Sequence, residues 1–353
     1  MPVRQQSSQE KDFFFQWHLT GRCNLACSHC YQEGAPGPEA DAAAIAKIAD
    51  AAADTVAAWG QAYGIAFLPA FNVTGGEPLI LPGIMGVLAL LKGKGFGVSL
   101  LTNGTLVDRE KARRLADLLD DAQISVEGPE RVHDAIRGQG SLAGAMRGTE
   151  LLAAAGIPVN LNVTLSRLNI DRIDDVIAMA RNAGARRVGF SRLVPSGRGR
   201  DLAGEMLSPN EVRDAYARLL GGGAAAADAA VPIRISTGDP IASALEGARG
   251  DCGAFPYAGC AAGVSGLTIL PDGTLLPCRR LAIPIGNALK GSIRRVWAES
   301  PVLETLRDRK SYKGTCGACE RWAECRGCRA IAYASSGLSG RADLCADDPQ
   351  CFL

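Results

Sequence analysis

Cysteine is the residue type in this chain best suited to carry chemistry, with 12 in 353 residues. Cys23, Cys27 and Cys30 lie close together, and the other nine all lie between Cys252 and Cys351. Thiols in a reducing cytosol rarely form disulfides, so metal ligation or redox chemistry is the expected use of so many cysteines. Their distribution predicts two separate sites built from cysteine.

The first group supplies three thiolates from one loop, with the spacing Cys23-x3-Cys27-x2-Cys30. An iron–sulfur cubane is held by cysteine thiolates and usually takes four. Three thiolates would leave one iron free to bind another molecule. A structural zinc ion also takes four ligands, and His18 or His29 could supply the fourth, so the spacing alone leaves zinc as an alternative.

Strands and helices alternate around this loop through the first half of the chain. Such alternation, with helices of about 10–15 residues, predicts βαβ units, a parallel sheet and hence an α/β fold. A closed eight-unit barrel needs about 250 residues, so we expect a partial (β/α)6 TIM-like barrel. The predicted strands are 13–20, 65–73, 97–102, 122–126, 158–163 and 187–193, and the predicted helices are 39–59, 80–93, 108–119, 141–155 and 170–183.

Motifs that could bind a ligand follow four of these strands: Cys23–Cys30, Gly75–Glu77, Thr102–Gly104 and Ser125–Glu127. The carboxyl ends of parallel strands meet at one edge of a sheet, where such folds bind their ligands. We therefore expect the four motifs to line one site, although they are far apart in the sequence. We also expect Val, Ile, Leu and Gly side chains to line the barrel.

The pattern changes beyond Pro195. Ser208 is a predicted N-cap for a helix of about 12 residues, and the low-complexity residues 221–230 are a predicted flexible link. Residues 267–278 predict a β-hairpin that turns at Pro-Asp-Gly, and residues 289–310 predict a helix. The expected parts are the partial barrel over 1–205, a helical or flexible bridge over 206–250 and a small cysteine-rich domain with the hairpin over 251–353.

Composition excludes several classes of protein. Lys plus Arg is 38 and Asp plus Glu is 37, and a net charge of +1 disfavours nucleic acid or an anionic membrane as the main partner. A hydrophobic content of 47% excludes a disordered chain. No apolar run approaches the roughly 18 residues of a transmembrane helix, and the N-terminus lacks a signal-peptide core. We expect a cytoplasmic protein.

Two motifs carry a resemblance to a known family. TGRCNLACSHCYQ, which contains the first three cysteines, and TGGEPL at 74–79 resemble the radical S-adenosyl-L-methionine (SAM) superfamily. The resemblance implies that Cys23, Cys27 and Cys30 hold a 4Fe–4S cluster whose unique iron binds the amino and carboxyl groups of SAM. It also implies that Gly75, Gly76 and Glu77 bind the SAM amino group. We expect His29, where the family often has an aromatic residue, to pack on the cluster edge.

The resemblance continues in order through residues 100–106, 123–142 and 156–169. It implies that SAM is contacted by Ser125, Glu127 and Asn162, and that Arg192 reaches the SAM carboxylate. The alternative is that these polar groups only cap strand ends. No catalytic base is assigned. For His133, Asp134 and Arg137, which follow the strand 122–126, we expect a solvated loop, and the alternative is that they face the cavity.

The second cysteine group has the central array Cys316-x2-Cys319-x5-Cys325-x2-Cys328, which by itself resembles a zinc ribbon. With Cys260-x12-Gly273-x4-Cys278 before it and DDPQC at 347–351 after it, the region resembles the SPASM extension of radical SAM enzymes, although the last gap of the array is two residues where three is more usual. The resemblance implies two auxiliary 4Fe–4S clusters. The outer cluster would be held by Cys316, Cys319, Cys325 and Cys351. The inner cluster would be held by Cys260, Cys278, Cys328 and Cys252. The spacing leaves Cys345 open as a replacement for Cys351.

The function that the resemblance implies is reductive cleavage of SAM to a 5′-deoxyadenosyl radical, which abstracts hydrogen from a substrate. The expected substrate is a ribosomally made precursor peptide; a haem or tetrapyrrole substrate is the alternative. Arg279 and Arg280 follow Cys278, where sulfatase-maturing relatives usually have an acid. This difference disfavours a sulfatase-maturing role. The two arginines could bind an anionic group of the substrate, tune the redox potential of a cluster, or be surface residues without a specific role.

The partners implied are an electron donor such as flavodoxin or ferredoxin and, for a peptide, a separate recognition protein or a groove of the extension. A reading from a different class is a zinc-stabilised binding module.

Overall fold

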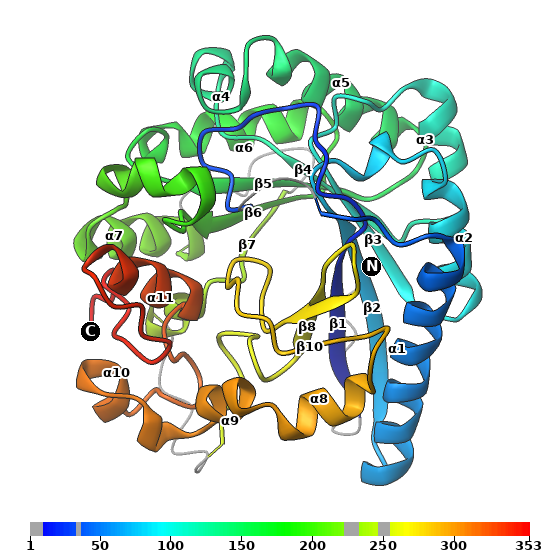
Figure 1. Ribbon diagram of the computed structural model, residues 1–353. Coiled ribbons are helices and arrows are strands. Elements are labelled where there is room, and N and C mark those ends of the chain that lie inside the picture. Colours follow the sequence, from blue (N-terminus) through cyan, green and yellow to red (C-terminus); the bar gives the residue numbers. More distant parts are fainter. Residues whose placement is uncertain (1–9, 33–36, 222–232, 246–254) are drawn as a thin grey trace.

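The computed structural model describes residues 10–32, 37–221, 233–245 and 255–353. One ten-stranded sheet runs through them in the order β10-β9-β8-β1-β2-β3-β4-β5-β6-β7. Strands β1 to β7 follow chain order and pair in parallel, which confirms the α/β barrel-like fold (Figure 1). These strands are β1 (Glu10–His18), β2 (Ala66–Thr74), β3 (Gly97–Thr102), β4 (Asp121–Ser125), β5 (Val159–Leu165), β6 (Arg187–Arg192) and β7 (Arg234–Thr237).

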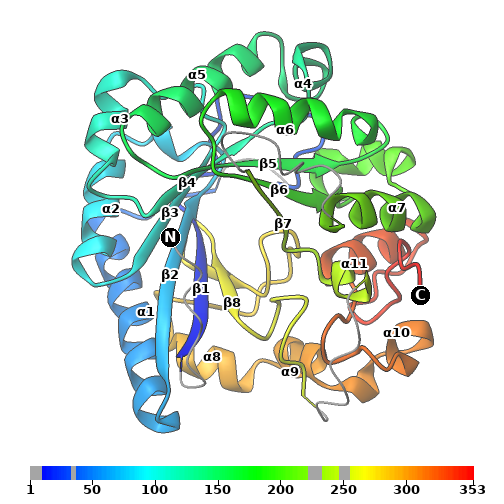
Figure 2. The same ribbon diagram turned by 180° about the vertical axis from the view of Figure 1, so that it is seen from behind.

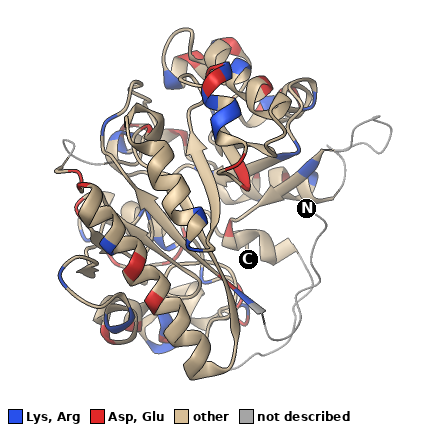
Figure 3. Ribbon diagram, turned by 90° about the vertical axis from the view of Figure 1, so that its right-hand side faces the viewer, with Lys and Arg blue, Asp and Glu red and all other residues tan. Residues whose placement is uncertain are grey.

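Helices cover the outer face of this curved sheet (Figures 1 and 2). They are α1 (Ala42–Tyr63), α2 (Ile84–Gly93), α3 (Arg109–Leu115), α4 (Glu130–Arg137), α5 (Ser141–Ala154), α6 (Ile173–Asn182) and α7 (Pro209–Leu220). Short 3-10 helices are η1 (Pro78–Ile80), η2 (Ile170–Arg172), η3 (Gly197–Glu205), η4 (Pro240–Leu245) and η5 (Arg309–Ser311). Basic and acidic residues are mixed over the outer helices (Figure 3). None of the described helices is both long and apolar enough to cross a membrane.

The alternation of side chains along the strands places the core between sheet and helices. Phe13 and Phe15 on β1 are buried on one face, and Phe13 packs edge-on against Trp59 of α1 with ring centres 5.0 Å apart. Residues two apart in a strand share a face. The opposite face of β4 and β5 carries Gln123, Ser125 and Asn162, which line a cavity. The expectation of an apolar interior is therefore wrong, because it ignored the polar residues that alternate with the apolar ones.

The cysteine-rich region continues the same sheet. Strand β8 (Gly266–Ile269) pairs in parallel with β1, and β9 (Thr274–Leu276) and β10 (Gly286–Asn287) follow as antiparallel neighbours, which confirms the predicted hairpin. A side chain at Gly266 would place a Cβ 2.6 Å from the ring of Phe14, so the close pairing with β1 requires glycine there. The remaining helices are α8 (Ile293–Glu299), α9 (Pro301–Arg307), α10 (Gly314–Ala318) and α11 (Arg329–Leu338).

Three local predictions differ from the structure. Residues 289–310 form two helices rather than one, because Ser300 is extended and Pro301 begins α9, where a missing amide hydrogen is tolerated. Residues 130–137 form helix α4 rather than a loop. Strand β7 was not predicted; its four residues lie next to the low-complexity segment 221–230, most of which is outside the described residues.

Candidate active site

A cavity of about 320 Å³ opens at the carboxyl ends of the parallel strands. The thiols of Cys23, Cys27 and Cys30 line it together with Gly75 and Gly76, which confirms that the two distant motifs share one site. Of the residues expected to contact SAM, the lining also includes Ser125, Asn162 and Arg192. Glu77 and Glu127 are not part of the lining.

Gly75 and Gly76 let β2 approach the chain that leads into the cysteine loop. The amide of Gly76 donates to the Thr20 carbonyl at 2.7 Å, and the amide of Glu77 donates to the Arg22 carbonyl at 2.8 Å. A Cβ would lie 2.4 Å from the Thr20 oxygen at Gly75 and 2.1 Å from the Arg22 oxygen at Gly76. The glycines therefore set the position of Cys23 as well as lining the cavity.

The carboxylate of Glu77 is fully buried behind the cavity wall. It accepts hydrogen bonds from the Thr102 hydroxyl at 2.7 Å and from the amides of Asn103 and Leu79 at 2.8 and 3.1 Å. Burial raises its pKa, while these hydrogen bonds oppose that shift. These hydrogen bonds join the turn after β2 to the end of β3, and the contact of this carboxylate with the SAM amino group stays a prediction.

Thr102 and Asn103 do more than form a turn. Both line the cavity. The side-chain Nδ2 of Asn103 donates to Asn24 Oδ1 at 2.9 Å. This hydrogen bond fixes the end of β3 to the cysteine loop beside Cys23.

Glu127 is likewise buried and acts through its neighbours. It lies 3.2 Å from His29 Nε2, accepts from Arg137 Nε at 2.9 Å and accepts from the Thr164 amide at 2.8 Å. Burial by itself would raise the pKa of Glu127, but the charges of Arg137 and His29 outweigh burial and lower it. The carboxylate orients the two cavity residues Arg137 and His29, and its own contact with SAM stays a prediction.

Arg137 is a cavity residue that the sequence analysis assigned to a solvated loop. Its Nη1 lies 3.8 Å from the sulfur of Cys27, and its Nη2 lies 3.4 Å from His29 Nε2. His29 lines the cavity, in keeping with its expected place beside a cluster, although the structure does not show the cluster itself. Arg137, at the end of α4, thus turns inward, toward the cysteine loop.

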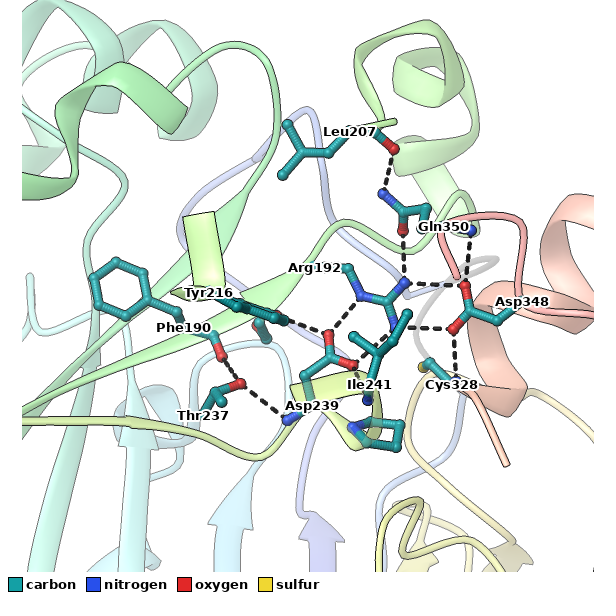
Figure 4. A network of polar contacts seen from close by, with 12 residues as sticks. Phe190, Arg192, Leu207, Tyr216, Thr237, Asp239, Ile241, Cys328, Asp348 and Gln350 are labelled. Carbon is teal, nitrogen blue, oxygen red and sulfur yellow. Dashed lines mark hydrogen bonds and ion pairs between the residues drawn. The ribbon is translucent and has the colours of Figure 1, made fainter. Parts of the chain in front are cut away.

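Arg192 is the centre of a buried ionic network at the end of β6 (Figure 4). Its Nε donates to Asp239 at 2.6 Å, its Nη2 to Asp348 at 2.8 Å and its Nη1 to Gln350 at 3.2 Å. The two carboxylates raise the pKa of the guanidinium against the opposing effect of burial. Arg192 is therefore not free to bind the SAM carboxylate as predicted; instead it joins the barrel to the C-terminal segment.

Two neighbouring aspartates, the exposed Asp347 and the buried Asp348, hold the backbone at two cysteines of the second group. The Cys328 amide donates to Asp348 at 2.8 Å, and the Cys316 amide donates to Asp347 at 2.7 Å. Burial raises the pKa of the Cys325 and Cys328 thiols to about 12. Metal binding deprotonates such thiols, so a metal would replace the proton that burial favours.

The Cys345 sulfur faces the Thr305 carbonyl at 3.9 Å. Cys252 lies outside the described residues. The ligand sets of the second group, including the choice between Cys351 and Cys345, stay predictions.

The comparisons with known proteins decide the family. Residues 17–180 match the radical SAM superfamily, and residues 260–329 match SPASM, an iron–sulfur cluster-binding domain. The AdoMet-dependent heme synthase of Nitratidesulfovibrio vulgaris is 30% identical, over 95% of this chain and 90% of that protein. The mycofactocin maturase MftC of Mycobacterium ulcerans is 34% identical, over 95% of this chain and 86% of that protein. The chain belongs to the radical SAM superfamily.

Solved structures agree on the fold. Streptococcus suis SuiB superposes with a TM-score of 0.73 at 16% identity, over 97% of this chain and 78% of that one. The structure of anSMEcpe with bound AdoMet superposes with a TM-score of 0.67 at 18% identity, over 94% of this chain and 93% of that one. This radical SAM protein is therefore an enzyme with a SPASM domain, which replaces the alternative of a zinc-stabilised binding module.

The residues present fit the cofactors of the superfamily, a 4Fe–4S cluster and SAM. Three thiols line one cavity beside a glycine pair, and no acidic side chain closes the cavity among the described lining residues. No three His, Cys, Asp or Glu side chains of the described residues are placed to bind a single metal ion. A cubane takes each thiolate on a different iron atom, so its ligands need not converge on one point.

Proposed function

We propose that this enzyme cleaves SAM reductively and uses the resulting 5′-deoxyadenosyl radical to take a hydrogen atom from a ribosomally made precursor peptide. The observation that carries the proposal is the convergence of Cys23, Cys27 and Cys30 with Gly75–Gly76 on one cavity, which Arg279, next to Cys278, also lines. The cavity thus reaches from the first cysteine group to the residues that follow Cys278.

The chain's own residues would divide the work as follows. The three cysteines would hold the 4Fe–4S cluster, which supplies one-electron chemistry that protein side chains lack. Ser125 and Asn162, on the cavity face of β4 and β5, would contact SAM. Arg137 and Glu127 would hold His29 and the Cys27 sulfur in place, as their present contacts do.

The second cysteine group would carry two auxiliary 4Fe–4S clusters with the ligand sets predicted above. Clusters there could accept the electron left on a substrate radical or hold the substrate. A reduced flavodoxin or ferredoxin would supply the first electron.

A peptide substrate is supported by two relatives. Mycofactocin maturase MftC is named for maturation, and SuiB has a solved structure bound to its precursor peptide SuiA. The second candidate is a haem or other tetrapyrrole substrate, favoured by the AdoMet-dependent heme synthases and the pre-heme d1 synthase among the relatives.

The test begins with anaerobic quantitation of iron, acid-labile sulfide and zinc in the purified enzyme. Dithionite and SAM are then added, and 5′-deoxyadenosine is measured by chromatography. We expect iron with matching sulfide, and 5′-deoxyadenosine that disappears in Cys27→Ala. Substantial zinc without sulfide would refute the proposal.

The substrate class is tested by mass spectrometry of the same reaction with candidate precursor peptides or with porphyrins. A mass change in a peptide supports the first candidate, whereas a change only in a porphyrin replaces it with the second.

A further inference from the structure

The cavity wall carries an excess of positive charge. Five arginines line it, and no Asp or Glu belongs to the described lining. Arg137 is neutralised by Glu127, and Arg192 by its two aspartates. The remaining three are Arg198, Arg279 and Arg280. An excess of this kind in a partly enclosed site attracts anions, because field lines concentrate where water is scarce.

Arg279 and Arg280 make no ion pair with an acid among the described residues. The Arg279 guanidinium lies 5.7 Å from the centre of the Tyr31 ring. Arg280 makes one long hydrogen bond, 3.5 Å from Nη1 to the Arg192 carbonyl, and its buried Nε has no partner. Buried guanidinium donors are normally hydrogen-bonded. The unused Nε of Arg280 and the unpaired charges of both arginines indicate an anion at this place.

The arginine pair lies between the two cysteine groups, because Arg279 contacts Tyr31, which follows Cys30, and is itself next to Cys278 in the chain. Arg279 and Arg280 also line an adjoining cavity of about 350 Å³, whose lining includes Cys328 and Asn160. Gln123, Asn162 and Ser191 line both cavities, so the two spaces meet at the arginines. Cys328 lines this adjoining cavity together with both arginines, so the pair borders the second cysteine group as well as the first cavity.

We propose that Arg279, supported by Arg280, binds a carboxylate of the substrate at the junction of the two cavities. This inference rests on the proposed function and narrows its substrate to a carboxylate-bearing molecule. A planar guanidinium with parallel N–H donors matches a carboxylate in two-point contact, and Tyr31 beneath it restricts its orientation. The carboxylate could belong to a peptide, at its C-terminus or on an acidic side chain, or to a tetrapyrrole propionate.

The experiment compares each acid probe with a neutral partner on the anaerobic, cluster-loaded enzyme with SAM. The probes are haem and haem dimethyl ester, and N-acetyl-phenylalanyl-phenylalanine and its C-terminal amide. Dissociation constants are measured by quenching of tryptophan fluorescence for wild type, Arg279→Gln, Arg279→Lys and Arg295→Gln. Arg295 is the control, because its side chain is 76% exposed and pairs only with Glu299 among the described residues.

We expect wild type to bind at least one acid about 10- to 100-fold more tightly than its neutral partner, the range for charge-assisted hydrogen bonds. Arg279→Gln should bring that ratio close to one, and Arg279→Lys should retain part of it. Arg295→Gln should match wild type. The pair that responds identifies the source of the carboxylate, peptide or tetrapyrrole.

The inference is overturned if no acid is preferred by wild type, or if Arg279→Gln keeps the full preference. Formation of 5′-deoxyadenosine is measured in parallel without substrate. Cleavage of SAM without any carboxylate preference would sink this inference alone, whereas absence of cleavage in wild type would sink the proposed function.

Discussion

Replacing Arg192 with Gln should destabilise the enzyme strongly, because it removes the cation between two buried acids. The Arg192 and Asp348 side chains are 0% exposed, and Asp239 is 4% exposed. Breaking a buried ion pair by removing one partner costs about 3–5 kcal/mol of unfolding free energy, since the other charge stays buried. At about 2 °C per kcal/mol for a chain of this size, the apparent Tm should fall by about 6–10 °C.

Arg218→Gln is the matched control for this variant. Arg218 also pairs with an aspartate, Asp174, but the two side chains are 47% and 63% exposed. Exposed pairs contribute about 0–1 kcal/mol, so its Tm should change by at most about 2 °C. The assay is anaerobic thermal unfolding of the cluster-loaded proteins at one scan rate, because such unfolding is often irreversible.

Arg192→Gln should also lower the iron content, since Asp348 holds both Arg192 and the Cys328 amide. Iron per protein is measured before heating and compared with the control variant. Equal Tm values for Arg192→Gln and Arg218→Gln would refute the reasoning, since burial is the main difference between the two ion pairs.

Three further predictions concern the cysteine groups and the turn after β2. Cys27→Ala should abolish 5′-deoxyadenosine formation, whereas Cys319→Ala should leave it largely intact and stop substrate turnover; equal loss in both would contradict two separate sites. Gly76→Ala should reduce iron at the first site, because its Cβ would lie 2.1 Å from the Arg22 oxygen; full iron content would contradict the packing argument. Glu77→Gln should cost about 1–3 kcal/mol in denaturant unfolding, because an amide nitrogen would face buried donors; an unchanged midpoint would show that the carboxylate is not needed.

The elements that position the site followed from local patterns. Alternating strands and helices predicted the parallel sheet, and the positions of Cys23 and Gly75 after successive strands predicted that they would meet. These inferences succeeded because hydrophobic periodicity and turn residues are read within about ten residues of chain. The α7 helix behind its Ser208 cap is a second example, with the predicted 12 residues.

The roles of individual charged residues did not follow from local patterns. Glu77 and Glu127 were expected to face a ligand, but both side chains are buried. Glu77 accepts from the Asn103 amide, 26 residues away, and Glu127 accepts from Arg137 and from the Thr164 amide, 10 and 37 residues away. A carboxylate after a strand can turn into the cavity or away from it, and the sequence around it is the same in both cases. Helix α4 was not predicted, but the sequence could have indicated it, since Val132 and Ile136 have helical spacing.

The sequence by itself determined the two groups of thiols, the order of strands β1 to β6 and the edge of the sheet where the site forms. Thiol spacing within one loop and the two side-chain periodicities are local properties, so they survive without knowledge of the fold. Only the tertiary structure decided which arginines are neutralised and which face the cavity. Arg192 meets Asp239 and Asp348 across 47 and 156 residues of chain, and burial of such pairs depends on how the whole sheet curves and closes.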